Sequence, residues 1–165
     1  MIALDAKVQV DFNPDVVDRY RLMGYENRAI ADQDFRDNRV DAGELGAGHS
    51  ATALYAVQFK EGAEGRIATI QLRWEDPDTH EIHEINGNFN TFSLEPSFES
   101  ADPYYRLAVV VAQYAEILRE SPYARGTSLD ELAEYADDLR REFPETEDVL
   151  EFAKLVERAS RISGR

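Results

Sequence analysis

The residues with the most obvious capacity for chemistry lie close together in the segment 41–49. One histidine, His49, follows two carboxylates, Asp41 and Glu44. Three glycines are interspersed with them: Gly43, Gly46 and Gly48. A histidine beside a carboxylate can transfer protons, and glycine allows turns and close backbone approaches that other residues resist. This segment is therefore the first candidate for a functional site.

Catalysis at this segment has two conceivable forms. Ser50 directly follows His49, but a Ser-His-Asp triad is assembled from separate segments, and no nucleophile elbow occurs in the chain. A histidine that bonds local backbone or a carboxylate is the favoured interpretation. The alternative is a hydrolase or carbohydrate-active domain with Asp41 and Glu44 as its acid/base pair, which requires carboxyl groups about 5–10 Å apart.

Metal binding is the next possibility, because carboxylates accumulate before and within the glycine segment. These acidic residues are Asp32, Asp34, Asp37, Asp41 and Glu44. Calcium prefers such oxygen ligands, but the glycine and the bidentate glutamate of an EF-hand are missing. Solvated carboxylates are favoured, with a divalent-ion-binding regulatory module as the alternative. His80 and His83 would face opposite sides of a strand, which disfavours a shared metal.

Cofactor binding has no motif to support it. Phosphate-binding glycine loops follow a strand and open a helix, whereas these glycines precede an apolar run and no lysine is near. The chain contains no cysteine, so thiolate metal sites and disulfides are excluded. We therefore expect no cofactor, and we interpret the glycines as a turn entering a central strand. Gly46→Val or Gly48→Val should lower the melting temperature by several degrees.

The charge of the chain excludes several classes of partner. The formal net charge is −15 and the isoelectric point is near 4.5. Such acidity disfavours nucleic acid and anionic membrane surfaces. No apolar run reaches the roughly 18 residues of a membrane span, so direct membrane insertion is not expected.

The hydrophobic pattern divides the chain into a β-rich part and a helical part. Alternating apolar and polar residues predict clear strands at 2–12 and 66–75. Other strands are expected at 17–26, 50–60, 80–86 and 89–94, with turns at 76–79 and at Asn86-Gly87-Asn88.

Helical periodicity begins after residue 98. Asp102-Pro103 predicts the start of a helix that ends before Ser121-Pro122, and Ser128 opens a second helix that ends at Phe143-Pro144. A third is expected over 145–162. The first helix is apolar on nearly all sides, which predicts burial on several sides. We therefore predict an α+β fold: an antiparallel, sandwich-like β part (1–98) and a three-helix part (99–165) packed on it as one compact unit.

Three segments carry a resemblance to a known family. They are Tyr20-Arg-Leu-Met-Gly-Tyr-Glu-Asn-Arg28, the glycine-rich run from Asp41 to Tyr55, and Ser121-Pro-Tyr123. The chain resembles the region that follows the von Willebrand factor A domain in YfbK-type bacterial proteins. The Asp-x-Ser-x-Ser metal motif of that A domain is missing from this sequence.

The resemblance implies a non-enzymatic accessory domain. Its expected partners are the adjacent von Willebrand factor A domain and an unidentified protein, and its expected location is the bacterial cell envelope or periplasm. Because the A domain is often inserted in a β-domain, the strand at 2–12 is expected to need partners from preceding residues. A sheet edge left open in this way could also support self-association.

Overall fold

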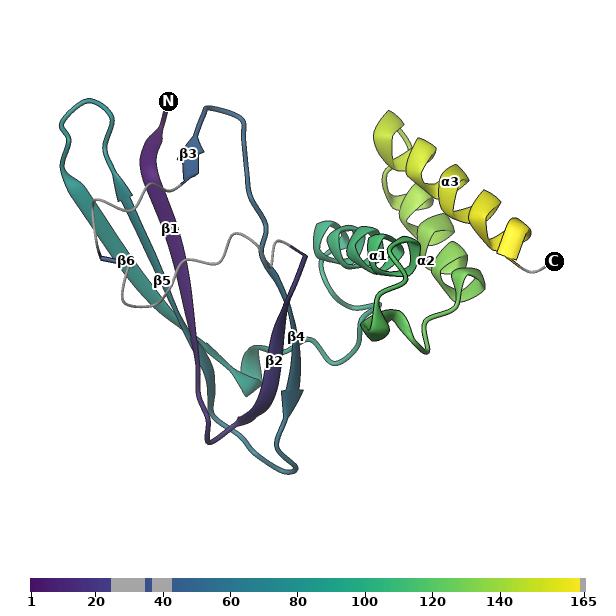
Figure 1. Cartoon of the computed structure of the whole chain (residues 1–165), viewed down its shortest axis with the longest axis horizontal. Coiled ribbons are helices and arrows are strands. Elements are labelled where there is room, and N and C mark those ends of the chain that lie inside the picture. The colour runs from purple at the N-terminus through teal and green to yellow at the C-terminus, as the bar shows by residue number, and fades with distance from the viewer. Residues whose placement is uncertain (25–34, 37–42, 164–165) are drawn as a thin grey trace. The chain divides into compact units, whose positions relative to one another are not determined.

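The computed structural model describes residues 1–24, 35–36 and 43–163. It divides the chain into two compact units, Met1–Leu94 and Glu95–Arg165 (Figure 1). The first unit holds the strands and the second holds the helices. The boundary at Leu94 lies slightly before the predicted one at residue 98. The predicted α+β class, with an antiparallel β part followed by three helices, is confirmed.

The main sheet of the first unit has four antiparallel strands in the order β3-β1-β5-β6. Their bounds are Gly43–Leu45 for β3, Ala3–Phe12 for β1, Arg66–Glu75 for β5 and Ile82–Asn90 for β6. The two long central strands, β1 and β5, have the clearest alternation in the sequence. Figure 1 shows β1, β5 and β6 side by side along most of their length.

Strand β1 has neighbours on both sides at its beginning. It pairs with β3 at Ala3 and Ala6, and with β5 from Leu4 to Phe12. A bulge lies between Leu4 and Lys7, where Asp5 has a φ of 47°. An extra residue at a bulge shifts the pairing register locally. Strand β3 covers only the first part of this side of β1, so a further partner from preceding residues stays a prediction.

A second, two-stranded sheet consists of β2 (Val17–Met23) and β4 (Leu54–Phe59). It contacts the main sheet at one end through aromatic rings. The ring of Phe12 stacks on Tyr20 at 4.1 Å and meets the edge of Tyr55 at 5.3 Å. Val16, Val17, Ile67 and Ala68 form the buried core beside these rings. The sandwich-like arrangement is thus confined to one end of the main sheet.

Three predicted features of the β part are wrong. Asn86-Gly87-Asn88 is not a turn, because these residues pair with Gln71, Ile70 and Thr69 inside β6. Residues 89–94 form no separate strand, since β6 continues to Asn90 and a 3₁₀ turn follows at Thr91–Ser93. The strand predicted at 50–60 begins only at Leu54.

The second unit contains α1 (Pro103–Leu118), α2 (Leu129–Glu142) and α3 (Glu147–Ser163). Side chains cap the first two helices as their sequences predict. Asp102 accepts hydrogen bonds from the backbone amides of Tyr104 and Tyr105, and Ser128 accepts one from Glu131. Among the described helices, none combines the length and apolar content that crossing a bilayer requires.

The core of the helical unit lies between its three helices. Val110 of α1, Leu139 of α2 and Val156 of α3 are at most 2% exposed and lie at its centre. Val110 and Glu116 are the residues of α1 that are fully buried. Glu116 accepts a hydrogen bond from Arg119 at 2.5 Å. Packing of the helices on the sheet stays a prediction.

Candidate functional site

The glycine segment contributes to the sheet. Gly43 and Glu44 belong to strand β3, with Gly43 opposite Ala6 of β1. The amide of Ile2 donates to the carbonyl of Leu45 at 2.8 Å. Asp41 lies outside the described residues, so its acid/base pairing with Glu44 stays a prediction. The side chain of Glu44 is exposed.

A short turn follows β3. The amide of His49 donates to the carbonyl of Gly46 at 3.1 Å, and Gly48 has a φ of +77°. Glycine is the residue that adopts this left-handed conformation readily. The strand that follows, β4, pairs with β2 and not with the main sheet. The prediction that this turn enters a central strand is therefore wrong, because the central strands are β1 and β5.

The predicted metal ligands do not come together in the part of the chain that the structure describes. The acidic residues Asp32, Asp34, Asp37 and Asp41 lie outside it. Within residues 1–24, 35–36 and 43–163, no three His, Asp or Glu side chains gather as a metal site requires. His80 lies in the turn before β6, and its ring is hydrogen-bonded to Glu75 at 2.6 Å. His83 lies on β6, and its ring stacks on Trp74.

One face of the main sheet carries a row of charges across three strands. Lys7 of β1 lies opposite Arg73 of β5, and Arg73 lies opposite Glu84 of β6. Lys7 is 3% exposed and Arg73 is 9% exposed. Both make further interactions within the molecule. Burial of charged groups is costly unless they are paired. The buried side chains of Lys7 and Arg73 therefore depend on hydrogen bonds and opposite charges around them.

Neighbouring polar side chains extend this row into a network. Arg36 donates to Glu84 at 2.7 Å and to Gln71 at 3.3 Å, and Gln71 donates to Asp11 at 2.8 Å. The hydrogen bond from Arg36 holds the pKa of Glu84 below its ordinary value. A carboxylate engaged in this way remains ionised and is a poor general base. The polar side chains of this face thus form hydrogen bonds with one another.

The opposite face of the same strands is apolar. Val8, Leu72 and Ile85 form one cross-strand row, and Val10 and Ile70 form the next. We call these five residues the apolar sheet face. Val8 is 59% exposed, Ile85 57% and Ile70 42%. Directly opposed residues of antiparallel strands lie on the same side, so these side chains form one continuous surface.

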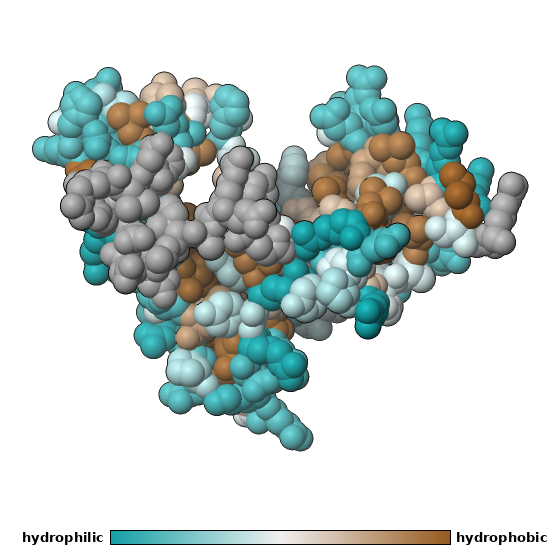
Figure 2. All heavy atoms as spheres, viewed as in Figure 1, coloured by the Kyte–Doolittle hydropathy of each residue, from teal (hydrophilic) through white to brown (hydrophobic). Residues whose placement is uncertain are grey.

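An exposed apolar surface on a sheet is unusual, since the buried side of a sheet is normally its apolar side. In this unit two basic residues of the polar face, Lys7 and Arg73, are buried. The apolar sheet face on the opposite side remains accessible to solvent. Figure 2 shows apolar residues reaching the surface among hydrophilic ones. The alternation in 66–75 placed Ile70 and Leu72 on one side of their strand, but it could not show that this side is uncovered.

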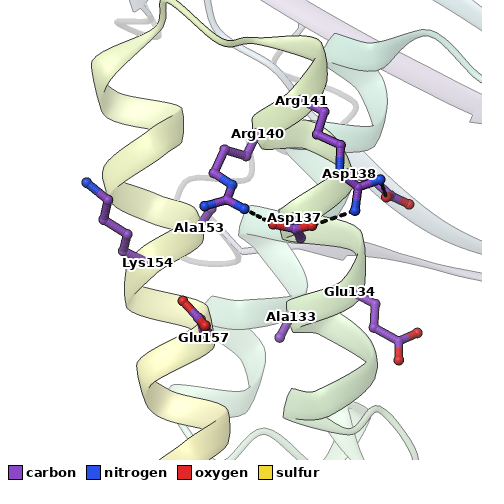
Figure 3. A pocket seen from close by; sticks show the side chains of 9 residues that line it. All are labelled: Ala133, Glu134, Asp137, Asp138, Arg140, Arg141, Ala153, Lys154 and Glu157. Atoms are coloured by element: carbon purple, nitrogen blue, oxygen red, sulfur yellow. Dashed lines mark hydrogen bonds and ion pairs between the residues drawn. The ribbon is translucent and has the colours of Figure 1, made fainter.

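A groove of about 470 Å³ lies between α2 and α3 and is lined largely by charged residues. Figure 3 shows Asp137 of α2 between Arg140 and Arg141. Arg141 reaches Asp137 at 2.5 Å and Asp138 at 2.9 Å. The charges therefore neutralise one another at the surface. Ligand pockets are mostly apolar with a few unpaired polar groups, which this groove does not resemble.

Comparison with known proteins identifies the family. Residues 1–162 match the family described as "Uncharacterized protein YfbK, C-terminal". The chain belongs to the YfbK C-terminal family. The resemblance found in the sequence motifs is thereby confirmed. The "Uncharacterized protein YfbK" of Escherichia coli (strain K12) is 28% identical over 181 residues, covering 98% of the chain. The chain spans 30% of the length of that relative. No solved structure matches the chain.

The motifs of the YfbK C-terminal domain occupy structural positions. Tyr20 lies on β2, and its ring stacks on Phe12 where the two sheets meet. The glycine-rich motif forms β3 and its turn. Ser121 of the third motif opens a 3₁₀ turn at Pro122–Ala124, and its hydroxyl accepts from the amide of Tyr123 at 3.3 Å. The described part of each motif thus lies in a strand or a turn, and a role of the glycine segment in interaction stays a prediction.

Proposed function

We propose that this YfbK C-terminal domain is a non-enzymatic accessory module that binds a neighbouring domain through its apolar sheet face. The observation that carries the proposal is the exposure of Val8, Ile70 and Ile85 in adjacent rows. Contiguous exposed apolar surface on a soluble fold marks an interaction site. Burial of these side chains would remove apolar area from water, which is the main driving force of association.

The neighbouring domain that we propose is a von Willebrand factor A domain of the same protein. The support is the resemblance in the sequence motifs, together with the greater length of the E. coli relative, of which the chain spans 30%. A location in the cell envelope belongs to the same proposal, and fractionation of bacteria that express the whole protein tests it. Recovery with the cytoplasm would contradict that location.

The non-enzymatic part of the proposal is supported by how the described polar groups are engaged. Glu84 and Asp11 accept hydrogen bonds from Arg36 and Gln71. These side chains are committed to partners within the fold, so no convergent set of acid, base and nucleophile is available among them.

Thiol labelling tests the binding surface directly, because the chain has no native cysteine. The Val8→Cys and Ile85→Cys variants are prepared both in this chain alone and in the longer protein. We expect rapid labelling in the isolated chain and strong protection in the longer protein. Asn86→Cys is the matched control, since Asn86 adjoins Ile85 but lies on the polar face. Equal labelling of Ile85→Cys in both proteins would refute the proposal.

A binding measurement in trans complements the labelling. The isolated preceding region is titrated with this chain and with its Ile85→Lys variant. An ammonium group at this position would have to be desolvated on binding, so the affinity should fall at least tenfold. Asn86→Lys should leave the affinity within about twofold, because it adds the same charge on the opposite face.

A further inference from the structure

Helix α1 has two apolar sides, and only one of them is used within the helical unit. Leu107, Val110, Tyr114 and Ile117 face the core between the three helices. The other side, which we call the α1 stripe, consists of Tyr104, Ala108, Val111, Ala115 and Leu118. Tyr104 is 71% exposed, Leu118 62% and Val111 43%. This surface is separate from the apolar sheet face.

The spacing of the α1 stripe fits another helix. Successive members are four, three, four and three residues apart, which is the heptad spacing of a helix–helix seam. Two small residues, Ala108 and Ala115, lie between three larger ones. This alternation allows the side chains of a facing helix to interlock at a short distance between the axes. The ring of Tyr104 is held against Phe143 with centroids 4.9 Å apart, so it is positioned before any partner binds.

The order of side-chain sizes along the α1 stripe favours a second copy of the same helix as the partner. Large, small, large, small, large reads the same in both directions from Val111. Two identical helices that pair antiparallel about a two-fold axis need such a sequence, because each residue meets its mirror position. Tyr104 would lie opposite Leu118 of the second copy, and Ala108 opposite Ala115.

The charges agree with this arrangement. No charged residue occurs from Leu107 to Ala115, so the middle of the seam desolvates no ion. Antiparallel pairing places Asp102 at one helix start near Arg119 at the end of the other helix, where Arg119 also bonds Glu116 of its own helix. Arg119 is 45% exposed. The helix dipoles also oppose one another favourably in this orientation.

We propose that two copies of the chain associate through the α1 stripe as an antiparallel helix pair. A single pair of helices buries less than the roughly 1,200 Å² of a standard stable interface, so the dimer forms and dissociates readily. The net charge of −15 on each copy opposes association. Added salt screens this repulsion and should therefore strengthen the dimer.

Disulfide trapping under mild oxidation tests both the partner and the direction. Val111→Cys lies on the proposed two-fold axis and should give a covalent dimer. A mixture of Tyr104→Cys and Leu118→Cys should give the mixed dimer in preference to either homodimer. The control Leu155→Cys, on α3 and 49% exposed, should stay monomeric. Preferential Tyr104→Cys homodimers would show a parallel pair and overturn the proposal.

Sedimentation velocity over a range of protein and salt concentrations tests the reversible dimer. Val111→Glu should lower the association constant at least tenfold, whereas Leu155→Glu, an equal change on another helix, should lower it less than twofold. Circular dichroism verifies that both variants are folded. A monomer at every concentration, or equal weakening by the two variants, would overturn the proposal. Slow thiol labelling of Val111→Cys in the monomer would show that another part of the chain covers the stripe, with the same consequence.

Discussion

Gly48 is the residue of the turn after β3 whose backbone requires glycine. Its φ is +77°, and a Cβ there would meet no atom within 4 Å. The difficulty for another residue is therefore backbone conformation and not space. We predict that Gly48→Val costs roughly 1–2 kcal/mol. This corresponds to a melting temperature lower by about 2–8 °C for a chain of this size, which differential scanning calorimetry measures.

Gly46 provides the contrast, because its backbone is not left-handed. A Cβ at Gly46 would come within 3.0 Å of Nδ1 of His49, whose exposed ring can rotate away. Of these two glycines, only Gly48 has a backbone conformation that valine adopts at a cost. Gly46→Val should therefore lower the melting temperature less than Gly48→Val does, and the reverse order would contradict this account.

Asp137 gives the helical unit a pH dependence with a defined sign. The hydrogen bond from Arg141 holds the pKa of Asp137 below its ordinary value of 3.8. The native state therefore favours the carboxylate, and this contribution to stability is fully present above about pH 5. It is lost as the pH falls through the lowered pKa. We predict that the free energy of unfolding, measured with urea at pH 7, is higher for wild type than for Asp137→Asn. The difference between the two proteins should shrink towards pH 2.

A second variant separates this ion pair from other effects of pH. Arg141→Gln removes one of the two arginine donors to Asp137, leaving Arg140 and the carboxylate in place. Two differences in unfolding free energy are compared. The difference between Arg141→Gln and the double variant Arg141→Gln/Asp137→Asn should depend less on pH than the difference between wild type and Asp137→Asn. An unchanged pH dependence would show that Arg141 is not its cause.

At the scale of the elements, Gly87 distinguishes a strand from a turn. Gly87 pairs with Ile70 within β6, its φ is not left-handed, and a Cβ there would meet nothing within 4 Å. A glycine inside a strand is destabilising by roughly 0.5–1 kcal/mol. We predict that Gly87→Thr raises the thermal midpoint by a few degrees, as followed by circular dichroism. If Asn86-Gly87-Asn88 were a tight turn, the same change would lower it.

The elements that the sequence predicts well are those with local signals. Asp102-Pro103, Ser128 and Phe143-Pro144 mark helix ends through caps and proline geometry, and all three lie where helices begin or end. The course of β6 through Asn86-Gly87-Asn88 could not be predicted, because pairing with β5 overrides the local turn preference. Strand β3 has only three residues and no periodicity to detect.

The candidate surfaces were harder to predict than the elements. The sequence placed Ile70 and Leu72 on one side of a strand, but their exposure depends on what the rest of the chain covers. Lys7 and Arg73 lie far apart in sequence, and only the strand register brings them opposite each other. For α1, the apolar composition predicted burial on several sides, but it could not show which side contacts α2 and α3 and which carries Tyr104, Val111 and Leu118.

At the scale of the whole molecule, the two units have separate cores. The cluster around Val16, Val17 and Ile67 belongs to residues 1–94, and the cluster around Leu139 and Val156 belongs to residues 95–165. We predict that residues 95–165 expressed alone retain helical circular dichroism and unfold cooperatively. Leu139→Ala in this fragment should cost about 2–5 kcal/mol, because Leu139 is 1% exposed. A fragment without a thermal transition would contradict this independence.

The strand order of the first unit also determines how it would respond to mechanical force. Strand β1 runs antiparallel to β5, and β5 runs antiparallel to β6, so Ala3 and Asn90 lie at opposite ends of the sheet (Figure 1). Tension applied to the two ends of this unit therefore acts along the strands. The hydrogen bonds between paired strands are then stressed simultaneously in shear. They do not break one after another. This geometry makes the β unit a stiff link that transmits a pull from its first strand to its last.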